Sequence, residues 1–393
     1  MSHQLISRSS DLRRLRDEGY EVEVRTNYLL VHSIPYVNSQ QRIAYGTLVS
    51  ELTLGGETTV QPNTHVVMFA GDHPCSKEGV PIAQIAHASA RQQLLPGLVV
   101  DHSFSNKPAT GYGDHYEKMT RYIDIISSAA KGLDPQVDAR TFKPVASANA
   151  DSVFRYIDTA SSRAGITAIS ERLSKFRIAI VGLGGTGSYV VDLVAKSAVH
   201  EIHLFDDDLY LQHNAFRSPG ATALQDLERQ IPKVTYLSEV YSRLRSGVVA
   251  HAVRITEANV AELKVFDFVF VCVDNGPARK LILDSLCAYG VPFVDVGMGV
   301  EVTADQKLFA VCRTTSATVG RTNHLDSRVP TADIDADAAY TQNIQIAELN
   351  ALNAAFAVLK WKKIFGIYED TEGEHHSTYS TNFHLLTGEE TAA

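Results

Sequence analysis

The stretch Arg177-Ile-Ala-Ile-Val-Gly-Leu-Gly-Gly-Thr-Gly187 decides the fold of this chain. A short apolar segment runs straight into a loop with glycines at Gly182, Gly184 and Gly187, and an amphipathic stretch at 188–198 follows. This order predicts a buried strand, a tight turn and a helix. Glycines let the backbone approach a phosphate closely, and the helix start offers unpaired amides and a positive dipole end. The unit therefore predicts a phosphate-bearing nucleotide, which NAD, FAD or ATP would satisfy.

Strand-like and helix-like segments alternate after this loop. Strands are expected at 201–205, 251–255, 266–273 and 292–296, and helices at 231–246 and 277–289. The run 266–273 is continuously apolar, which is typical of a parallel strand buried on both faces. This alternation predicts an α/β fold with a Rossmann-like, doubly wound, mainly parallel sheet. After Gly297, segments 300–302 and 307–313 are expected to form a hairpin that continues the sheet antiparallel.

The last part of the chain carries less regular signals. We expect a polar loop at 314–339 and a long helix at 343–364, whose wide apolar face indicates packing rather than ligand binding. The pair His375 and His376 lies in a polar tail, and we expect it to be solvated surface.

The first part of the chain has a different pattern, which predicts a domain boundary near residue 150. Residues 1–150 are expected to form an α+β domain, and residues 151–393 the nucleotide-binding domain. In the first domain, helices are expected at 10–18, 82–95 and 116–131, and strands at 21–25, 28–34, 43–52 and 65–70. Another helix is expected across 154–163.

Composition excludes several classes of protein. The formal net charge of −9 over 393 residues, without a long basic run, argues against a general nucleic-acid binder. No segment approaches the roughly twenty apolar residues that span a bilayer, so we expect no membrane association and a cytoplasmic location. The four cysteines form no CxxC pair, so no structural zinc is expected. They are Cys75, Cys272, Cys287 and Cys312.

Polar residues that follow the predicted strands narrow the choice of nucleotide. Asp206 lies 19 positions after Gly187, where a carboxylate can accept hydrogen bonds from a ribose. A second set lies on the same edge of the sheet and consists of Asp208, Asn214, Arg217, Lys233 and Asp274. The site of a dinucleotide dehydrogenase has no need of two cations at this edge, whereas a site that binds a triphosphate does. Arg217 and Lys233 would neutralise departing pyrophosphate, and Asp274 would hold Mg²⁺.

At this point the sequence resembles the ThiF/MoeB/ubiquitin-activating superfamily of adenylating enzymes. The matching elements are GLGGTG at 182–187, DDDLYLQHNAFR at 206–217, IPKV at 231–234 and CVDN at 272–275. The family version of the second run is DxD followed by Asn-Leu-x-Arg, and here Asn214-Ala-Phe-Arg217 replaces the leucine by alanine. The resemblance covers roughly residues 152–365, and four ordered elements at family spacing make it specific.

The resemblance implies ATP- and Mg²⁺-dependent adenylation of the C-terminal carboxylate of a ubiquitin-like or sulfur-carrier protein. By position, it implies that the nucleotide is bound by Gly182, Gly184, Gly185, Gly187, Asp206 and Asp208. It assigns Asn214, Arg217 and Lys233 to the phosphates and Asp274 to Mg²⁺. The family often lends an arginine across a homodimer, a role for which Arg155 and Arg163 are candidates.

The sequence departs from the family at the acyl-accepting cysteine. Many relatives use a cysteine in the loop after the sheet, but residues 314–343 contain none, and Cys312 lies just before them. Three outcomes stay open. The adenylate is passed directly to a partner, which we favour, or Cys312 forms a thioester, or a hydroxyl of Thr314, Thr315 or Ser316 forms an oxyester.

The overall pattern also resembles a bacterial subgroup with an extra N-terminal domain, associated with ubiquitin-like conjugation pathways. The first domain resembles ubiquitin-conjugating or RWD-like domains, which implies binding of the carrier, of a conjugating-enzyme-like partner or of a second protomer. Two other classes stay open from the residues alone. One is an NAD(P)-dependent oxidoreductase, and the other is a non-catalytic nucleotide-binding scaffold.

Overall fold

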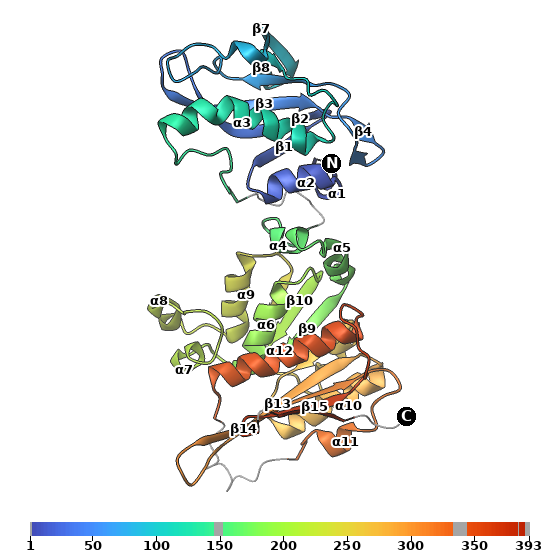
Figure 1. Cartoon of the computed structure of the whole chain (residues 1–393). Coiled ribbons are helices and arrows are strands. Elements are labelled where there is room, and N and C mark those ends of the chain that lie inside the picture. Colours follow the sequence, from blue (N-terminus) through green and yellow to red (C-terminus); the bar gives the residue numbers. More distant parts are fainter. Residues whose placement is uncertain (1, 145–151, 333–343, 384, 390–393) are drawn as a thin grey trace. The chain divides into compact units, whose positions relative to one another are not determined.

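A computed structural model of the chain describes residues 2–144, 152–332, 344–383 and 385–389 (Figure 1). The chain divides into two compact units, each described here by itself. The first unit comprises Met1–Asp151 and Tyr156–Gly165, and the second comprises Ser152–Arg155 and Ile166–Ala393. In the described part of the chain, no helix combines the length and apolar character that crossing a bilayer requires.

The first unit is an antiparallel sheet with helices packed on one face. The strands lie in the order β1-β2-β3-β6-β8-β7. Their bounds are β1 Glu21–Arg25, β2 Tyr28–Val37, β3 Ile43–Glu51, β6 Val66–Ala70, β7 Ala86–Leu95 and β8 Leu98–Ser105, with a separate small pair of β4 Leu54–Gly55 and β5 Thr58–Thr59. The helices are α1 Ser2–Arg8, α2 Ser10–Asp17, η1 Ala83–Ile85, α3 His115–Leu133 and α4 Thr159–Arg163. Buried Leu12, Phe69 and Tyr122 join α2, the sheet and α3 in one core.

The expected helix at 82–95 is wrong, because strand β7 occupies most of it. Strands β7 and β8 form a hairpin in which Leu95 pairs with Leu98 across Pro96 and Gly97. Gly97 has φ +76°, and proline followed by a left-handed glycine is the signature of a type II turn. After this turn, Leu98 lies on the sheet and is buried. Pairing of β7 with β8 therefore outweighs the helix-like spacing of the alanines in β7.

The expected helix across 154–163 is only partly correct. Phe154 makes a bridge to Arg245 in extended conformation, and α4 begins at Thr159. Asp158 accepts a hydrogen bond from the Ser161 amide and so caps this short helix at its start.

The second unit contains the predicted Rossmann-like sheet, in the order β11-β10-β9-β12-β13-β14-β15-β16. Pairing is parallel from β11 to β13 and antiparallel from β13 to β16. The bounds are β9 Arg177–Val181, β10 Glu201–Phe205, β11 Val248–His251, β12 Phe268–Val271, β13 Phe293–Val302, β14 Leu308–Ala317, β15 His376–Ser380 and β16 Leu385–Glu389. This confirms the predicted fold class. The expected strand at 292–296 and the expected hairpin arm at 300–302 are one continuous strand, β13, which runs through Gly297 and pairs antiparallel with β14.

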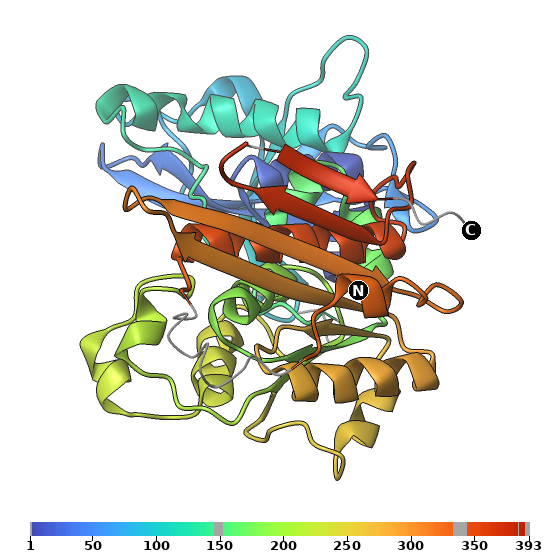
Figure 2. The same ribbon diagram turned by 90° about the horizontal axis from the view of Figure 1, so that it is seen from below.

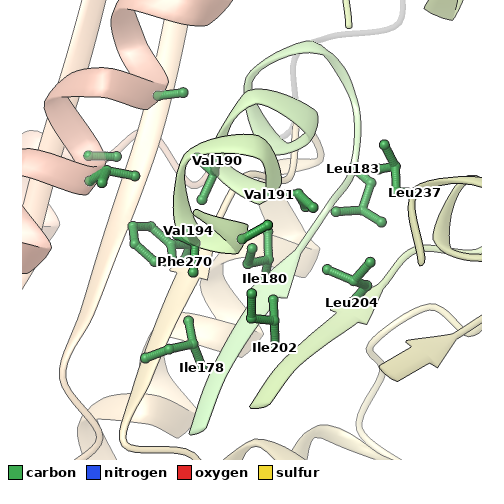
Figure 3. Packing of buried hydrophobic residues seen from close by; sticks show 14 of the residues in the cluster. Ile178, Ile180, Leu183, Val190, Val191, Val194, Ile202, Leu204, Leu237 and Phe270 are labelled. Carbon is green, nitrogen blue, oxygen red and sulfur yellow. The ribbon is translucent and has the colours of Figure 1, made fainter. Parts of the chain in front are cut away.

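Helices cover both faces of this sheet. Ile178 and Ile180 point to the face that α6 Gly185–Ala195, α9 Lys233–Ser242 and α12 Ala347–Ile364 cover (Figure 3). Ala179 and Val181 point to the opposite face, that of α10 Gly276–Tyr289 and η3 Val260–Val265. The gold helix α10 is visible in Figure 2. The shorter helices are α5 Thr167–Ser170, η2 Glu171–Leu173, α7 Gln212–Ala215, α8 Leu224–Glu228 and α11 Leu325–Arg328.

Two expectations for the last part of the chain are wrong. The loop expected from 314 begins later, because β14 continues to Ala317, and residues 333–339 of it lie outside the described residues. The polar tail is a further part of the sheet, since β15 pairs with β14. His375 and His376 are 8% and 9% exposed, and their Nδ1 atoms lie 3.1 Å from Ser316 Oγ and 3.0 Å from Thr315 Oγ1. Hydroxyl partners on β14 make burial of both rings possible.

Replacing Gly187 by alanine is expected to destabilise the second unit by about 3 kcal/mol, because the added Cβ would collide with the Gly182 carbonyl oxygen. Gly184→Ala is the matched control, since its Cβ would meet nothing closer than 3.8 Å. It should cost less than about 1 kcal/mol. Denaturant unfolding followed by the fluorescence of Trp361, the one tryptophan of the sequence, reads this unit alone. Equal losses in the two variants would contradict the tight packing of the loop.

Candidate functional site

The glycine loop joins β9 to α6 through a turn that only glycine can make. Gly182 has φ +88°, and a Cβ there would lie 2.7 Å from the Cys272 carbonyl oxygen of the neighbouring strand β12. Helix α6 then begins at Gly185, with Gly184 at its N-cap and no capping side chain of its own. The first amides of this helix therefore face the loop without an acceptor from the N-cap residue, as in anion-binding helix starts.

Asp206 directly follows β10 and connects this strand to the glycine loop. Its Oδ2 accepts a hydrogen bond of 2.6 Å from the Leu183 amide, and its Oδ1 accepts one of 2.9 Å from the Asp208 amide. The side chain is only 8% exposed. The carboxylate thus fixes the loop against the end of β10.

Lys233 lies against the same carboxylate from the first residue of α9. Its Nζ is 3.2 Å from Asp206 Oδ1 and 2.6 Å from Asp208 Oδ2, and its side chain is 7% exposed. The hydrogen bond from Lys233 lowers the pKa of the Asp208 carboxyl. Pro232 precedes the helix, and the Lys233 amide donates to the Asp208 carbonyl at 2.9 Å, so the backbone holds the two segments together.

Asn214 and Arg217 come from the short helix α7 and its end. Asn214 is 2% exposed, and its Oδ1 accepts a hydrogen bond from the Leu211 amide at 2.8 Å. The Arg217 amide donates to the Asn214 carbonyl at 3.1 Å, and Arg217 Nε is buried with no hydrogen-bond partner among the described residues. Partial desolvation and the charges of Arg217 and Lys233 lower the pKa of His213. Arg217 and Lys233 therefore both act on His213 electrostatically, so the two cations lie in one part of the site.

Asp274 lies three residues after β12, next to the glycine loop. The Cys272 amide donates to the Val181 carbonyl at 2.8 Å, which holds the two strand ends together. Asn275 caps α10 by accepting from the Ala278 amide at 2.9 Å, so Asp274 does not perform that role.

A second group of carboxylates could hold a metal ion, but basic side chains already neutralise it. The side-chain oxygens of Asp206, Asp207 and Asp208 lie within 4.8 Å of one another. Lys233 pairs with the first and the third, and Arg254 pairs with Asp207 at 3.2 Å. A cation here would have to displace Lys233.

The site also contains residues that sequence reasoning missed. Gln345 Oε1 accepts from the Gly185 amide at 3.1 Å, and Asn350 Oδ1 accepts from Thr186 Oγ1 at 2.9 Å. Both lie about 160 positions after the loop, at the start of α12. The asparagines of this helix were the only available signal, and nothing in their spacing indicated the loop as their partner.

The two arginines expected to act across a dimer belong to different units of the chain. Arg155 Nε donates to the Ser242 carbonyl at 3.2 Å, at the opposite end of α9 from Lys233. With a rise of about 1.5 Å per residue, that end lies roughly 14 Å from Lys233. Arg163 ends α4 and belongs to the first unit.

The four candidate acyl acceptors all lie on β14 and are buried. Cys312 is 2% exposed, and burial raises the pKa of its thiol to about 11. Thr314 is 4% exposed, and Thr315 and Ser316 are fully buried. Neither a thiolate nor an accessible hydroxyl is therefore presented by this strand.

Comparisons with known proteins give two family matches. A model described as the ThiF family matches residues 127–382, and a model described as a domain of unknown function (DUF6791) matches residues 10–159. Ubiquitin-like modifier-activating enzyme 5 of Gallus gallus is 29% identical over 150 residues, which cover 35% of this chain and 38% of that protein. Adenylyltransferase and sulfurtransferase MOCS3 of Danio rerio is 27% identical over 125 residues, which cover 31% of this chain and 27% of that protein.

The matches with curated relatives thus span about two fifths of their length or less. Among solved structures, a crystal structure of E. coli MccB with ATP is 17% identical, with a TM-score of 0.44. The match covers 59% of this chain and 69% of that one.

Replacing Lys233 by methionine is expected to destabilise the second unit by about 3 kcal/mol, because it leaves the buried Asp206 carboxylate without its cation. Unfolding followed by Trp361 fluorescence measures the loss. Lys280→Met is the control, because this exposed lysine pairs with Asp284 on the surface of α10 and should matter little. A Lys233→Met variant as stable as the wild type would show that Asp206 does not depend on this pair.

Proposed function

The chain belongs to the ThiF family, and on that premise we propose that it is an adenylyltransferase acting on the C-terminal carboxylate of a ubiquitin-like protein. One observation carries the proposal. The glycine loop, the Asp206–Lys233 pair and the positive surroundings of Arg217 lie at the carboxyl edge of the sheet, where such folds bind ligands. The residues suit a nucleotide triphosphate better than a dinucleotide, because two cations lie beside the loop.

ATP would supply the adenylyl group, with pyrophosphate as the leaving group. A carboxylate oxygen of the carrier would form a bond to the α-phosphorus as the bond to the pyrophosphate oxygen breaks. In this proposal the loop amides hold phosphate oxygens, and Asp206 orients the ribose. Asn214, Arg217 and Lys233 offset the charge that develops on the leaving pyrophosphate. Lys233 would turn from Asp208, which is 63% exposed and easily solvated, toward the phosphates.

Magnesium is assigned to Asp274 in this proposal. Its carboxylate supplies the hard oxygen ligand that Mg²⁺ prefers, and the neighbouring backbone of Cys272 packs against Gly182. A cation held by Asp274 would supply Lewis-acid stabilisation of the phosphate charge.

The burial of Cys312 and of the three hydroxyls favours direct release of the adenylate to a partner. We therefore propose that the acyl group leaves the site without a covalent enzyme intermediate, in a homodimer that serves a bacterial ubiquitin-like conjugation pathway. The first unit, an α+β domain over residues 1–150, is proposed to bind the carrier or a conjugating-enzyme-like partner. The match of residues 10–159 to a separate family model supports a distinct role for this unit.

Exchange of labelled pyrophosphate into ATP tests the proposed function. With a purified ubiquitin-like protein ending in glycine, the wild type is expected to catalyse exchange that depends on the carrier and on Mg²⁺. Asp274→Ala should lower the exchange rate at least about a hundredfold, because metal stabilisation of phosphate charge is lost. Asp284→Ala, at an exposed position of α10, is the control. ATP binding without exchange would reject catalysis, and an active Asp274→Ala variant would reject the metal assignment.

Cys312→Ala is expected to leave exchange and transfer to a partner unchanged, because this buried thiol takes no part in the reaction. Single-turnover reactions analysed on non-reducing gels measure any acyl-enzyme. A thiol-sensitive adduct that disappears in Cys312→Ala would contradict direct release. A hydroxide-sensitive adduct that persists in this variant would instead indicate an oxyester.

A further inference from the structure

A side chain from a distant part of the sequence accepts the hydrogen bond of the first backbone amide of α6. Gly184 at the N-cap has no side-chain oxygen, and the Gly185 amide donates to Gln345 Oε1 at 3.1 Å. Amides at a helix start lack intrahelical acceptors and lie at the positive end of the helix dipole. Gln345 thus places a neutral oxygen where an anionic oxygen would bind more favourably.

A second side chain beside the same glycine has a buried donor without an acceptor. Asn350 is fully buried, and its Nδ2 has no hydrogen-bond partner in the parts of the chain that the structure describes. This nitrogen is the atom that a Cβ on Gly185 would strike first, so it is aimed at Gly185. Its Oδ1 is held by the Thr186 hydroxyl. An unsatisfied buried donor is costly, which points to an acceptor that is not part of this chain.

We propose that Gln345 and a phosphate of the nucleotide compete for the Gly185 amide, an inference that rests on the proposed function. One N–H group makes one well-aligned hydrogen bond, so the two acceptors exclude each other. Phosphate binding therefore displaces Gln345, whereas Asn350 keeps its hydrogen bond with Thr186.

This competition ties the nucleotide to the segment that enters α12. Gln345 lies two residues before the start of that helix, which packs along α6 and against β13. Release of Gln345 frees the backbone at 344–346 from the loop, whereas Asn350 and the packed part of α12 stay in place. Gln345 is then a negative determinant of affinity for the phosphate-bearing nucleotide.

Removal of the competing acceptor is expected to tighten ATP binding. Gln345→Ala should lower the Kd for ATP about threefold to tenfold, the range that corresponds to one net hydrogen bond. Gln345→Asn, which keeps the amide but shortens its reach, should behave similarly. Gln345→Glu should weaken binding, because a carboxylate competes more strongly and repels phosphate. Titration calorimetry with ATP measures all three variants.

Adenosine and a matched glutamine variant complete the experiment. The Kd for adenosine should be the same in the wild type and Gln345→Ala, because adenosine has no phosphate. Gln225→Ala, at an exposed position on α8, should leave both affinities unchanged. Trp361 fluorescence verifies that each variant is folded.

Each outcome decides one of the two proposals. Weaker or unchanged ATP binding by folded Gln345→Ala, with ATP bound by the wild type, would overturn the competition and leave the proposed function standing. Tighter binding of ATP and adenosine alike would also overturn it, because the phosphate would not be the competitor. A wild type that binds no ATP would reject the proposed function itself.

Discussion

The candidate site depends on one buried carboxylate, that of Asp206. It accepts hydrogen bonds from the Leu183 and Asp208 amides and pairs with Lys233, so it holds the glycine loop, the segment after β10 and the start of α9 together. A buried charge of this kind is tolerated only when its lone pairs and its charge are both satisfied. The same arrangement holds a buried lysine beside the carboxylate that fixes the glycine loop. Stability of the loop and charge of the site thus arise from a single cluster.

Helix α12 has a second role at this loop besides covering the sheet. Its apolar side packs Trp361 against the core around Phe268 and Phe270, whereas its first turns present amides to the loop and to β13. Asn353 Nδ2 donates to the Gly297 carbonyl at 3.1 Å, and Asn350 holds Thr186. Because both amides lie on a rigid helix, the loop is buttressed from outside its own strand–helix unit. The C-terminal part of the chain is therefore needed to complete the site.

Strand β14 buries all four side chains that the sequence offered as acyl acceptors. Its residues pair with β13 on one side and β15 on the other, which buries Cys312 and the following hydroxyls. Arg313 also bonds buried Asp295 at 2.6 Å, and Arg279 reaches the same carboxylate at 3.1 Å. Burial of this acid raises its pKa, and the two guanidiniums oppose that shift. The strand is thus locked into the sheet as a structural element.

The sequence by itself determined the elements whose signals are local. The strand–glycine–helix unit, the parallel strands predicted at 201–205 and 266–273 and an antiparallel extension of the sheet all follow from apolar periodicity and glycine placement. Tertiary structure decided features that depend on long-range pairing. The Pro96-Gly97 turn allowed a segment with helix-like spacing to form strand β7. Pairing of β15 with β14 buried the side chains of His375 and His376. Gln345 and Asn350 contact the glycine loop from about 160 positions away in the sequence. Such contacts leave no periodic trace, because they depend on which surfaces meet once the sheet has formed.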